Sequence, residues 1–247
     1  MRKDSPLIIG AGRGENFIAS DVPAILKHTR DVYRLGEREL AILTKDGVTV
    51  INSYGERVNC VYEHIDWDAS AAEKCGYPHF MIKEIMEQPE AIAKTIAPRI
   101  SNGRIELGFK HITAEMLKKV NSIKIIGCGS AYHVGFVAGY FMRTALRIPV
   151  ESVLASEFRY DDPIVDENTL AIVISQSGET LDTLYGLREA KKHGAKTIAI
   201  MNVVGSTIAN ESEDVLYTWA GPEIAVATTK AYSTQLVLCL LYTSPSP

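Results

Sequence analysis

The sequence predicts an α/β protein, built mainly on a doubly wound parallel sheet and preceded by a β-rich segment. Two apolar runs, Ile123–Gly127 and Leu170–Ser175, stop at small or hydroxyl residues and are each followed by a helical pattern. That order is typical of buried parallel strands that feed helices. Strand and helix patterns then alternate from about residue 112 onward, as they do in βαβ units.

The bulk composition restricts the class of protein. The 247 residues are enough for one large domain or two smaller ones, and the net charge of −4 argues against a nucleic-acid partner. No apolar run approaches the ~20 residues that span a bilayer, so we expect no membrane segment. The four cysteines lie far apart and the histidines do not pair at metal-ligand spacing. We therefore expect reduced thiols in a cytoplasmic protein, with no metal and no cofactor.

The first part of the chain, residues 1–66, has the pattern of short strands and turns. Residues 6–10 predict a strand, 22–28 one or two helical turns, and 40–44 a strand that pairs through an Asp-Gly turn with 48–52. Because the chain begins inside a strand pattern, we interpret this segment as the end of a longer domain.

A helix follows the N-terminal segment. Residues 67–77 lack periodicity and predict a linker, whereas His79–Ala97 carries apolar residues at helical spacing and predicts an amphipathic helix. Pro89 lies inside it and predicts a kink or the start of a second helix.

The remaining elements are those of the parallel sheet. We expect strands at 123–128, 149–154, 170–175, 196–201 and 214–218; helices at 113–120, 131–146, 180–193 and 228–242; and short helical turns at 155–160 and 206–210. The last helical pattern breaks off abruptly at residues 242–247, which we interpret as truncation or foreign sequence.

The hydroxyl loop, Ser175-Gln-Ser-Gly-Glu-Thr180, is the strongest candidate for a binding site. Three hydroxyls and free backbone N–H groups lie where a helix dipole favours an anion. An ordinary capping box needs only one hydroxyl and one carboxylate. Because the loop contains no Lys or Arg, we expect a small phosphorylated ligand rather than a nucleotide held by a lysine.

Other motifs favour ordinary structural roles. Gly10-Ala-Gly-Arg-Gly14 lacks dinucleotide-binding spacing and predicts a structural or gating loop. Ser130 is expected to be a helix N-cap. Lys230 is expected to face either a ligand or solvent, and solvent is the commoner surrounding of a single lysine. Cys128 is expected to be a small buried thiol rather than a nucleophile. Glu157 and Arg159 predict either an internal pair or ordinary surface residues.

Five segments together resemble the glutamine–fructose-6-phosphate aminotransferase (glucosamine-6-phosphate synthase) family, and they are Gly14–Asp21, Asp66–Asp68, His79–Pro89, Ser175–Thr180 and Glu223–Tyr232. The resemblance runs to about Leu241. It implies that residues 1–66 are the C-terminal part of a glutaminase domain with the N-terminal nucleophile hydrolase fold. Residues 67–111 would then be an interdomain linker with a helix, and 112–247 a truncated first sugar-isomerase (SIS) domain.

The resemblance also implies an activity and a set of ligand contacts. The family converts fructose 6-phosphate and glutamine to glucosamine 6-phosphate and glutamate, usually as a homodimer. The positions that match its sugar-phosphate contacts are Ser130, Ser175, Gln176, Ser177, Thr180 and the backbone of Val226. Ala131 stands where the family has a hydroxyl.

The catalytic residues of the family have no counterpart here. Its cysteine nucleophile and the rest of its glutamine site belong to the missing part of the glutaminase domain. Its general base, ring-opening histidine and Schiff-base lysine belong to a second SIS domain. We therefore expect an internal piece of the enzyme that binds sugar phosphate and has no activity by itself.

Two other functions stay open from the sequence. One is a non-catalytic SIS regulator that binds sugar phosphate, and the other is a SIS-family deglycase that acts on phosphorylated amino sugars. A regulator would carry a helical DNA-binding domain in place of residues 6–66.

Overall fold

The computed structural model describes residues 1–3, 6–20, 22, 24–65 and 74–243, with side chains as far as 241. Two compact units divide the chain, Met1–Gly76 and Tyr77–Pro247, and each is described by itself. Most of the predicted linker at 67–77 and the final residues 244–247 lie outside the described residues.

The first unit consists of antiparallel sheets. One has the strand order β2-β1-β3-β7 and the other β4-β5-β6. Their bounds are β1 Ile8–Ala11, β2 Asn16–Ala19, β3 Asp31–Arg34, β4 Leu40–Thr44, β5 Gly47–Ile51, β6 Arg57–Val58 and β7 Glu63–His64. The predicted strand at 40–44 and its hairpin are confirmed. The predicted helical turns at 22–28 are confirmed in the described part of that segment, where the N–H groups of His28 and Thr29 donate to the Ile25 carbonyl at 2.9 and 3.0 Å and Ile25 and Leu26 pack into the core.

The glycine-rich segment at 10–14 is a hairpin connection. Gly10 belongs to β1, and β2 follows as an antiparallel partner in which Gly10 pairs with Phe17. A dinucleotide site needs a helix after such a turn, with its N-terminus at the pyrophosphate. The structure therefore agrees with the structural interpretation of this segment.

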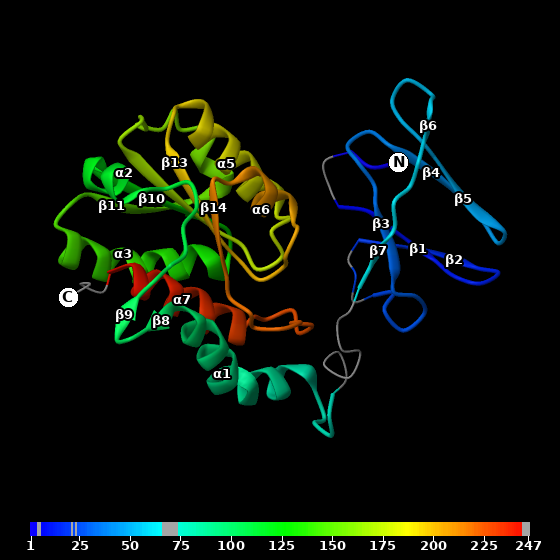
Figure 1. Cartoon of the computed structure of the whole chain (residues 1–247), viewed down its shortest axis with the longest axis horizontal. Coiled ribbons are helices and arrows are strands. Elements are labelled where there is room, and N and C mark those ends of the chain that lie inside the picture. The colour runs from blue at the N-terminus through cyan, green and yellow to red at the C-terminus, as the bar shows by residue number, and fades with distance from the viewer. Residues whose placement is uncertain (4–5, 21, 23, 66–73, 244–247) are drawn as a thin grey trace. The chain divides into compact units, whose positions relative to one another are not determined.

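The second unit is built on a five-stranded parallel sheet with the order β11-β10-β12-β13-β14 (Figure 1). The strands are β10 Ser122–Gly127, β11 Val150–Leu154, β12 Thr169–Ile174, β13 Lys196–Met201 and β14 Asp214–Tyr217. The helices are α2 Ala114–Lys119, α3 Ser130–Leu146, α4 Ala155–Phe158, α5 Leu181–Lys192, α6 Thr207–Glu211 and α7 Lys230–Thr243. The predicted doubly wound α/β fold is confirmed.

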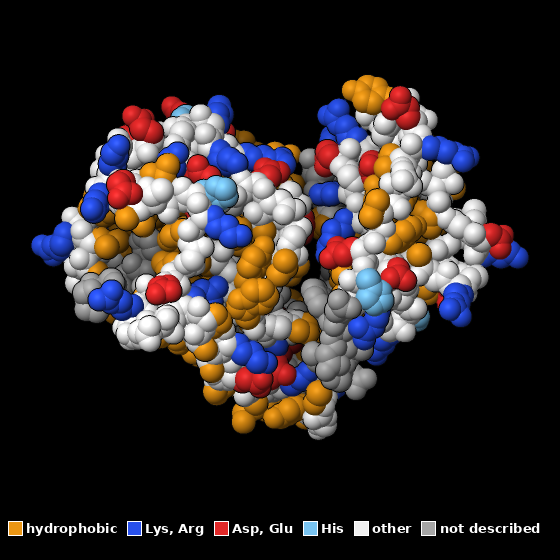
Figure 2. Space-filling model, in the orientation of Figure 1, with side chains coloured by type: hydrophobic (Ala, Val, Ile, Leu, Met, Phe, Trp, Pro, Cys, Tyr) orange, Lys and Arg blue, Asp and Glu red, His pale blue; other side chains and the backbone are white. Residues whose placement is uncertain are grey.

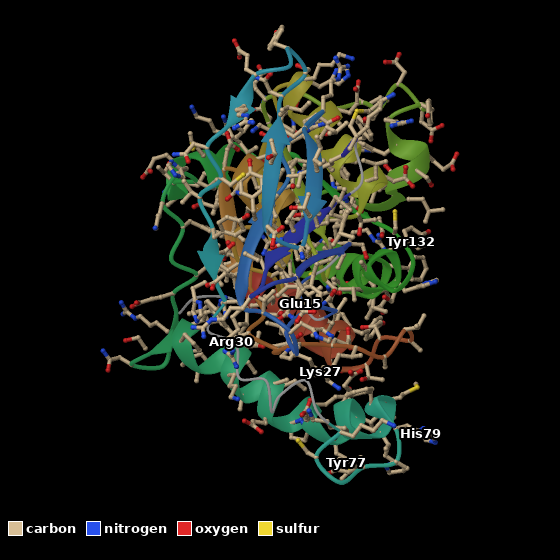
Figure 3. The ribbon with its side chains drawn as sticks, turned by 90° about the vertical axis from the view of Figure 1, so that its right-hand side faces the viewer. Glu15, Lys27, Arg30, Tyr77, His79 and Tyr132 are labelled. Carbon is tan, nitrogen blue, oxygen red and sulfur yellow. The ribbon has the colours of Figure 1, made fainter. Side chains whose placement is uncertain are left out.

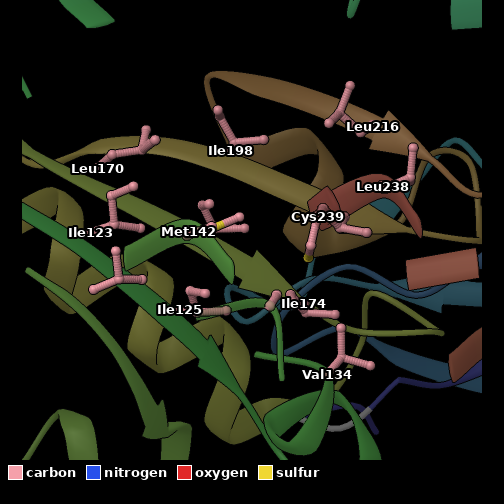
Figure 4. Packing of buried hydrophobic residues seen from close by; sticks show 14 of the residues in the cluster. Ile123, Ile125, Val134, Met142, Leu170, Ile174, Ile198, Leu216, Leu238 and Cys239 are labelled. Carbon is pink, nitrogen blue, oxygen red and sulfur yellow. The ribbon is translucent and has the colours of Figure 1, made fainter. Parts of the chain in front are cut away.

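Both faces of this sheet are buried. Along β12, Leu170, Ile172 and Ile174 join a core that includes residues of α3 and α7 (Figure 4). Their neighbours Ala171 and Val173 join a second core with residues of α4, α5 and α6. Successive side chains of a strand point to opposite faces, so a strand covered on both sides must be apolar throughout. This explains the unbroken apolar run of β12.

Helix α1, Phe80–Ile96, confirms the predicted helix, but the apolar side that an amphipathic helix normally buries is partly exposed. It continues through Pro89, so no second helix starts there. Its buried residues are Lys83, Glu84, Ala91 and Thr95, whereas Ile82, Ile85 and Met86 are exposed. Figure 2 shows hydrophobic side chains exposed along the lower edge of the view, where α1 lies. The polar face is the buried one because it finds hydrogen-bonding partners beside α7, to which α1 packs.

The ends of α1 lead into short connections. Tyr77 and His79 lie at its N-terminal end (Figure 3), and His79 occupies the N-cap position. At the other end follow a 3₁₀ turn and a small hairpin, with bounds η2 Ala97–Arg99, β8 Ile100–Ser101 and β9 Arg104–Ile105. The guanidinium of Arg99 donates to the carbonyl of Tyr217 at 2.6 Å, which ties this connection to the end of β14.

A buried carboxylate fixes the chain that precedes α2. Asp214, at the start of β14, accepts backbone hydrogen bonds from Lys110 at 2.8 Å, His111 at 2.9 Å and Ile112 at 2.7 Å. Three N–H groups that no helix or strand satisfies are thereby paired. The segment before the sheet is thus held against its edge strand.

Candidate functional site

The candidate site lies where the strand order of the parallel sheet reverses. The chain passes from β10 to β11 on one side, then returns to β12 on the other side of β10. In open α/β sheets, ligands bind outside the carboxyl ends of the strands at such a switch point. The loops that leave β10 and β12 there are residues 128–129 and the hydroxyl loop 175–180.

The hydroxyl loop is organised by its own side chains. Ser175 Oγ accepts a hydrogen bond from the Gly178 N–H at 3.0 Å and lies 3.1 Å from Thr180 Oγ1. Ser177 Oγ accepts from the Glu179 N–H at 3.2 Å. A hydroxyl carries one hydrogen, and the Ser175–Thr180 bond uses only one. Two of the three hydroxyl hydrogens are therefore available to donate to an anion.

Gly178 and Glu179 clamp the loop to the neighbouring helix α6. A Cβ added at Gly178, where φ is +68°, would lie 2.0 Å from Ser206 Oγ, so only glycine allows this approach. The Glu179 carboxylate accepts hydrogen bonds from the Thr207 N–H at 2.9 Å and its hydroxyl at 2.8 Å. The one carboxylate of the loop is thus occupied at the N-terminus of α6.

The structure brings all the predicted site residues around one pocket of about 240 Å³. These are Ser130, Ser175, Gln176, Ser177, Thr180 and Val226. Ser130 is the first residue of α3, and Gly129 holds the N-cap position, so the predicted N-cap role of Ser130 is wrong. Ala131, which also lines the pocket, offers no side-chain hydroxyl there.

Sequence reasoning missed four polar residues of the pocket wall, which are Thr183, Glu223, Thr228 and Gln235. Glu223 caps α7 from seven positions upstream: its carboxylate accepts from the Thr228 hydroxyl at 2.7 Å and the Thr229 N–H at 2.9 Å. Capping signals are normally sought within the first turn. A cap at this distance depends on how the loop between Glu223 and α7 folds back, and only the tertiary structure shows that path.

A charged network under α1 supports the loop at 223–228. Glu84 is buried, and its Oε1 accepts from the N–H groups of Ile224 at 2.7 Å and Ala225 at 3.1 Å. Lys230 is only 3% exposed and its Nζ lies 2.7 Å from Glu87 Oε2. The expectation that Lys230 faces solvent is wrong, because α1 provides a carboxylate partner.

The other candidate residues have structural surroundings. The Arg159 guanidinium lies over the rings of Tyr160 and Tyr185, at 4.4 and 4.6 Å from their centroids, and forms no ion pair with Glu157 among the described residues. Cys128 is half-buried, lines the pocket, and accepts a 3.7 Å hydrogen bond from the Thr183 hydroxyl.

Across the part of the chain that the structure describes, no three His, Cys, Asp or Glu side chains gather closely enough to hold a metal ion. Within those same residues no helix has the length and apolarity to cross a bilayer.

A five-stranded doubly wound sheet with a hydroxyl-lined pocket at its switch point is the architecture of a sugar-isomerase domain. The chain belongs to the SIS domain family, whose model matches residues 116–244. It is 57% identical to the glutamine–fructose-6-phosphate aminotransferase (isomerizing) of Clostridium tetani, over 96% of this chain and 39% of the relative. The same enzyme from Caldanaerobacter subterraneus is 56% identical, over 97% of this chain and 40% of the relative. The predicted resemblance is confirmed, and the chain spans about two fifths of these relatives.

Solved structures give the same result for the second unit. The C-terminal domain of glucosamine-fructose-6-phosphate aminotransferase from Francisella tularensis superposes with a TM-score of 0.66 at 42% identity, covering 69% of this chain and 48% of that one. A glucosamine-6-phosphate deaminase from Thermotoga maritima superposes with a TM-score of 0.52 at 25% identity, covering 67% of this chain and 50% of the deaminase chain.

Proposed function

We propose that this chain is the sugar-phosphate-binding part of a glutamine–fructose-6-phosphate aminotransferase and holds fructose 6-phosphate and its product glucosamine 6-phosphate. One observation carries the proposal: the hydroxyl loop, Ser130 and Val226 surround a single pocket at the switch point of the sheet. The similarity to aminotransferases over 96% of the chain supports it. It also favours this function over a regulator, which would not share the N-terminal unit.

The phosphate belongs at the hydroxyl loop. Ser175, Ser177 and Thr180 offer hydroxyl hydrogens there, and α5 begins directly after the loop, so its N-terminal N–H groups favour an anion. The lining residues include no Lys or Arg, so neutral donors would hold the phosphate. The sugar would then extend toward Ser130 and the backbone at Val226. A pocket of about 240 Å³ is small, which matches a monosaccharide phosphate.

The rest of the proposal concerns the whole protein. Residues 1–66 would be the C-terminal part of its glutaminase domain, 67–111 the linker, and 112–247 the first SIS domain. Glutamine would bind the other part of the glutaminase domain, and the protein would be a cytoplasmic homodimer. The four cysteines form no disulfide, which supports a reducing compartment. This chain alone would release no ammonia from glutamine and form no glucosamine 6-phosphate.

Calorimetric titration of the chain with fructose 6-phosphate tests the proposal. Ser177→Ala should weaken binding about tenfold or more, because a hydrogen bond to a charged group contributes about 1.5–3 kcal/mol. Thr144→Ala removes an exposed hydroxyl at the far end of α3 and should bind as the wild type does. Equal affinity of the wild type and Ser177→Ala, or equal affinity for fructose and fructose 6-phosphate, would contradict the proposed phosphate site.

A further inference from the structure

We propose that Gln235, in α7, is a specificity-determining residue that binds a hydroxyl of the sugar. The inference rests on the proposed function and adds a residue to its site. Gln235 lines the pocket and is only 2% exposed. None of the described residues forms a hydrogen bond with its side-chain amide.

The Gln235 side chain is almost covered, but its amide atoms are not among the fully buried unpaired side-chain atoms of the described residues, which are Arg2 Nε, Glu84 Oε2, Ser206 Oγ and Thr229 Oγ1. The amide therefore keeps access to the pocket, where a polar group without a protein partner is paired by water or by a ligand. The neighbouring polar side chains of α7 are paired: the Thr234 hydroxyl donates to the Lys230 carbonyl at 2.9 Å, and Lys230 pairs with Glu87. Gln235 differs from them in lining the pocket. A ligand in the pocket would supply the missing partner.

The chemistry of the amide selects the part of the ligand that it would meet. An amide both donates and accepts hydrogen bonds, and a sugar hydroxyl does the same. A phosphate oxygen only accepts, and Ser177 and its neighbours already offer donors to it. Gln235 also comes from a different element, α7, than the hydroxyl loop after β12. The amide therefore matches the polyol part of the ligand rather than its phosphate.

Such a contact would distinguish sugars by their hydroxyls. A site that hydrogen-bonds a hydroxyl rejects an analogue without it, because the buried polar group is then left unpaired. The hydroxyl loop cannot make this distinction, since every sugar phosphate presents the same anion. Gln235 would thus add sugar recognition to phosphate recognition.

The test compares two ligands on the full chain, inorganic phosphate and fructose 6-phosphate, by NMR titration. Gln235→Leu should keep its affinity for inorganic phosphate within about twofold and lose about tenfold or more for fructose 6-phosphate, the factor that a hydrogen bond in a buried site contributes. Ser177→Ala should weaken both ligands. Gln235→Met, which keeps the unbranched shape, should repeat the result of Gln235→Leu.

Thermal stability separates a binding role from a structural one. Because no described residue pairs with the amide, Gln235→Leu and Gln235→Met should melt at or above the temperature of the wild type. A lower melting temperature in both variants would assign Gln235 a structural role and overturn the inference. So would unchanged affinity for fructose 6-phosphate, or an equal loss for both ligands. If the wild type binds neither ligand, the proposed function itself fails.

Discussion

Glu84 in helix α1 accepts a hydrogen bond of 2.7 Å from the backbone N–H of Ile224, 140 residues further along the chain. The same carboxylate oxygen accepts from Ala225 at 3.1 Å. Ala225 and Val226 line the pocket, so a residue outside the parallel sheet holds one wall of the candidate site. Helix α1 is therefore a structural part of the site, although it precedes the sheet in the sequence.

Glu84→Ala should weaken both the pocket and the fold. It leaves two N–H groups without their acceptor, and hydrogen bonds to a charged group contribute about 1.5–3 kcal/mol each. We expect a loss of about 3 kcal/mol in the free energy of unfolding and about tenfold in affinity for fructose 6-phosphate, measured by urea denaturation and calorimetry. Glu84→Gln, whose carbonyl still accepts, should recover most of the affinity.

The matched control for Glu84 is Glu90→Ala on the same helix. Glu90 is exposed, and its pKa is lowered by a hydrogen bond and charge attraction from Lys94. Such surface pairs contribute little to stability, so this variant should bind as the wild type does. If Glu84→Ala also binds normally, the loop does not depend on α1.

Gly178→Ala should distort the hydroxyl loop. The added Cβ would meet Ser206 Oγ at 2.0 Å, and φ of +68° is unfavourable for alanine. Overpacking of this kind costs about 1–3 kcal/mol in addition to the backbone strain of about 1 kcal/mol. We expect a lower melting temperature and a loss of phosphate binding. Scanning calorimetry measures the first, and titration calorimetry measures the second.

Gly205→Ala separates the two causes. Its φ is +73°, but an added Cβ meets nothing within 4 Å, so only the backbone strain remains. It should be destabilised by about 1 kcal/mol and keep its phosphate affinity. A Gly178→Ala protein no less stable than Gly205→Ala would show that Ser206 moves aside without cost.

Asp214→Ala should destabilise the second unit by about 3 kcal/mol or more, because it leaves the N–H groups of Lys110, His111 and Ile112 without acceptors. Asp161→Ala, an exposed carboxylate in the same unit, should change stability by less than about 0.5 kcal/mol. The free energy of unfolding from urea titration measures both. Equal stability of the two variants would show that the segment before α2 is not held by Asp214.

Cysteine reactivity should follow burial. Burial raises the pKa of the Cys239 thiol to about 12, so at pH 8 or 9 it stays protonated, and the thiolate is the reactive form. Iodoacetamide should therefore modify the exposed Cys75 but not Cys239 in the folded protein, and both after denaturation. Mass spectrometry of the labelled chain measures this. Native labelling of Cys239 at pH 8 would show that α7 opens.

Short strands limited the prediction of the first unit. β2 and β3 have four residues each, and burial does not alternate regularly along them, so Asn16–Ala19 and Asp31–Arg34 show no clear period. The hairpin of β4 and β5 was predictable because its Asp-Gly turn is a local signal.

Local patterns determined the order of the elements in the second unit and the position of the hydroxyl loop. A strand buried on both faces needs an apolar run such as Thr169–Ile174, and small and hydroxyl residues such as Ser175–Thr180 are typical of the turn between a strand and a helix. Three features were decided by the tertiary structure alone: the face of α1 that is buried, the pairing of Lys230 with Glu87, and the position of Gln235 in the pocket wall. Those outcomes depend on partners far away in the chain, such as Glu84 and Ile224, and a local period carries no information about them.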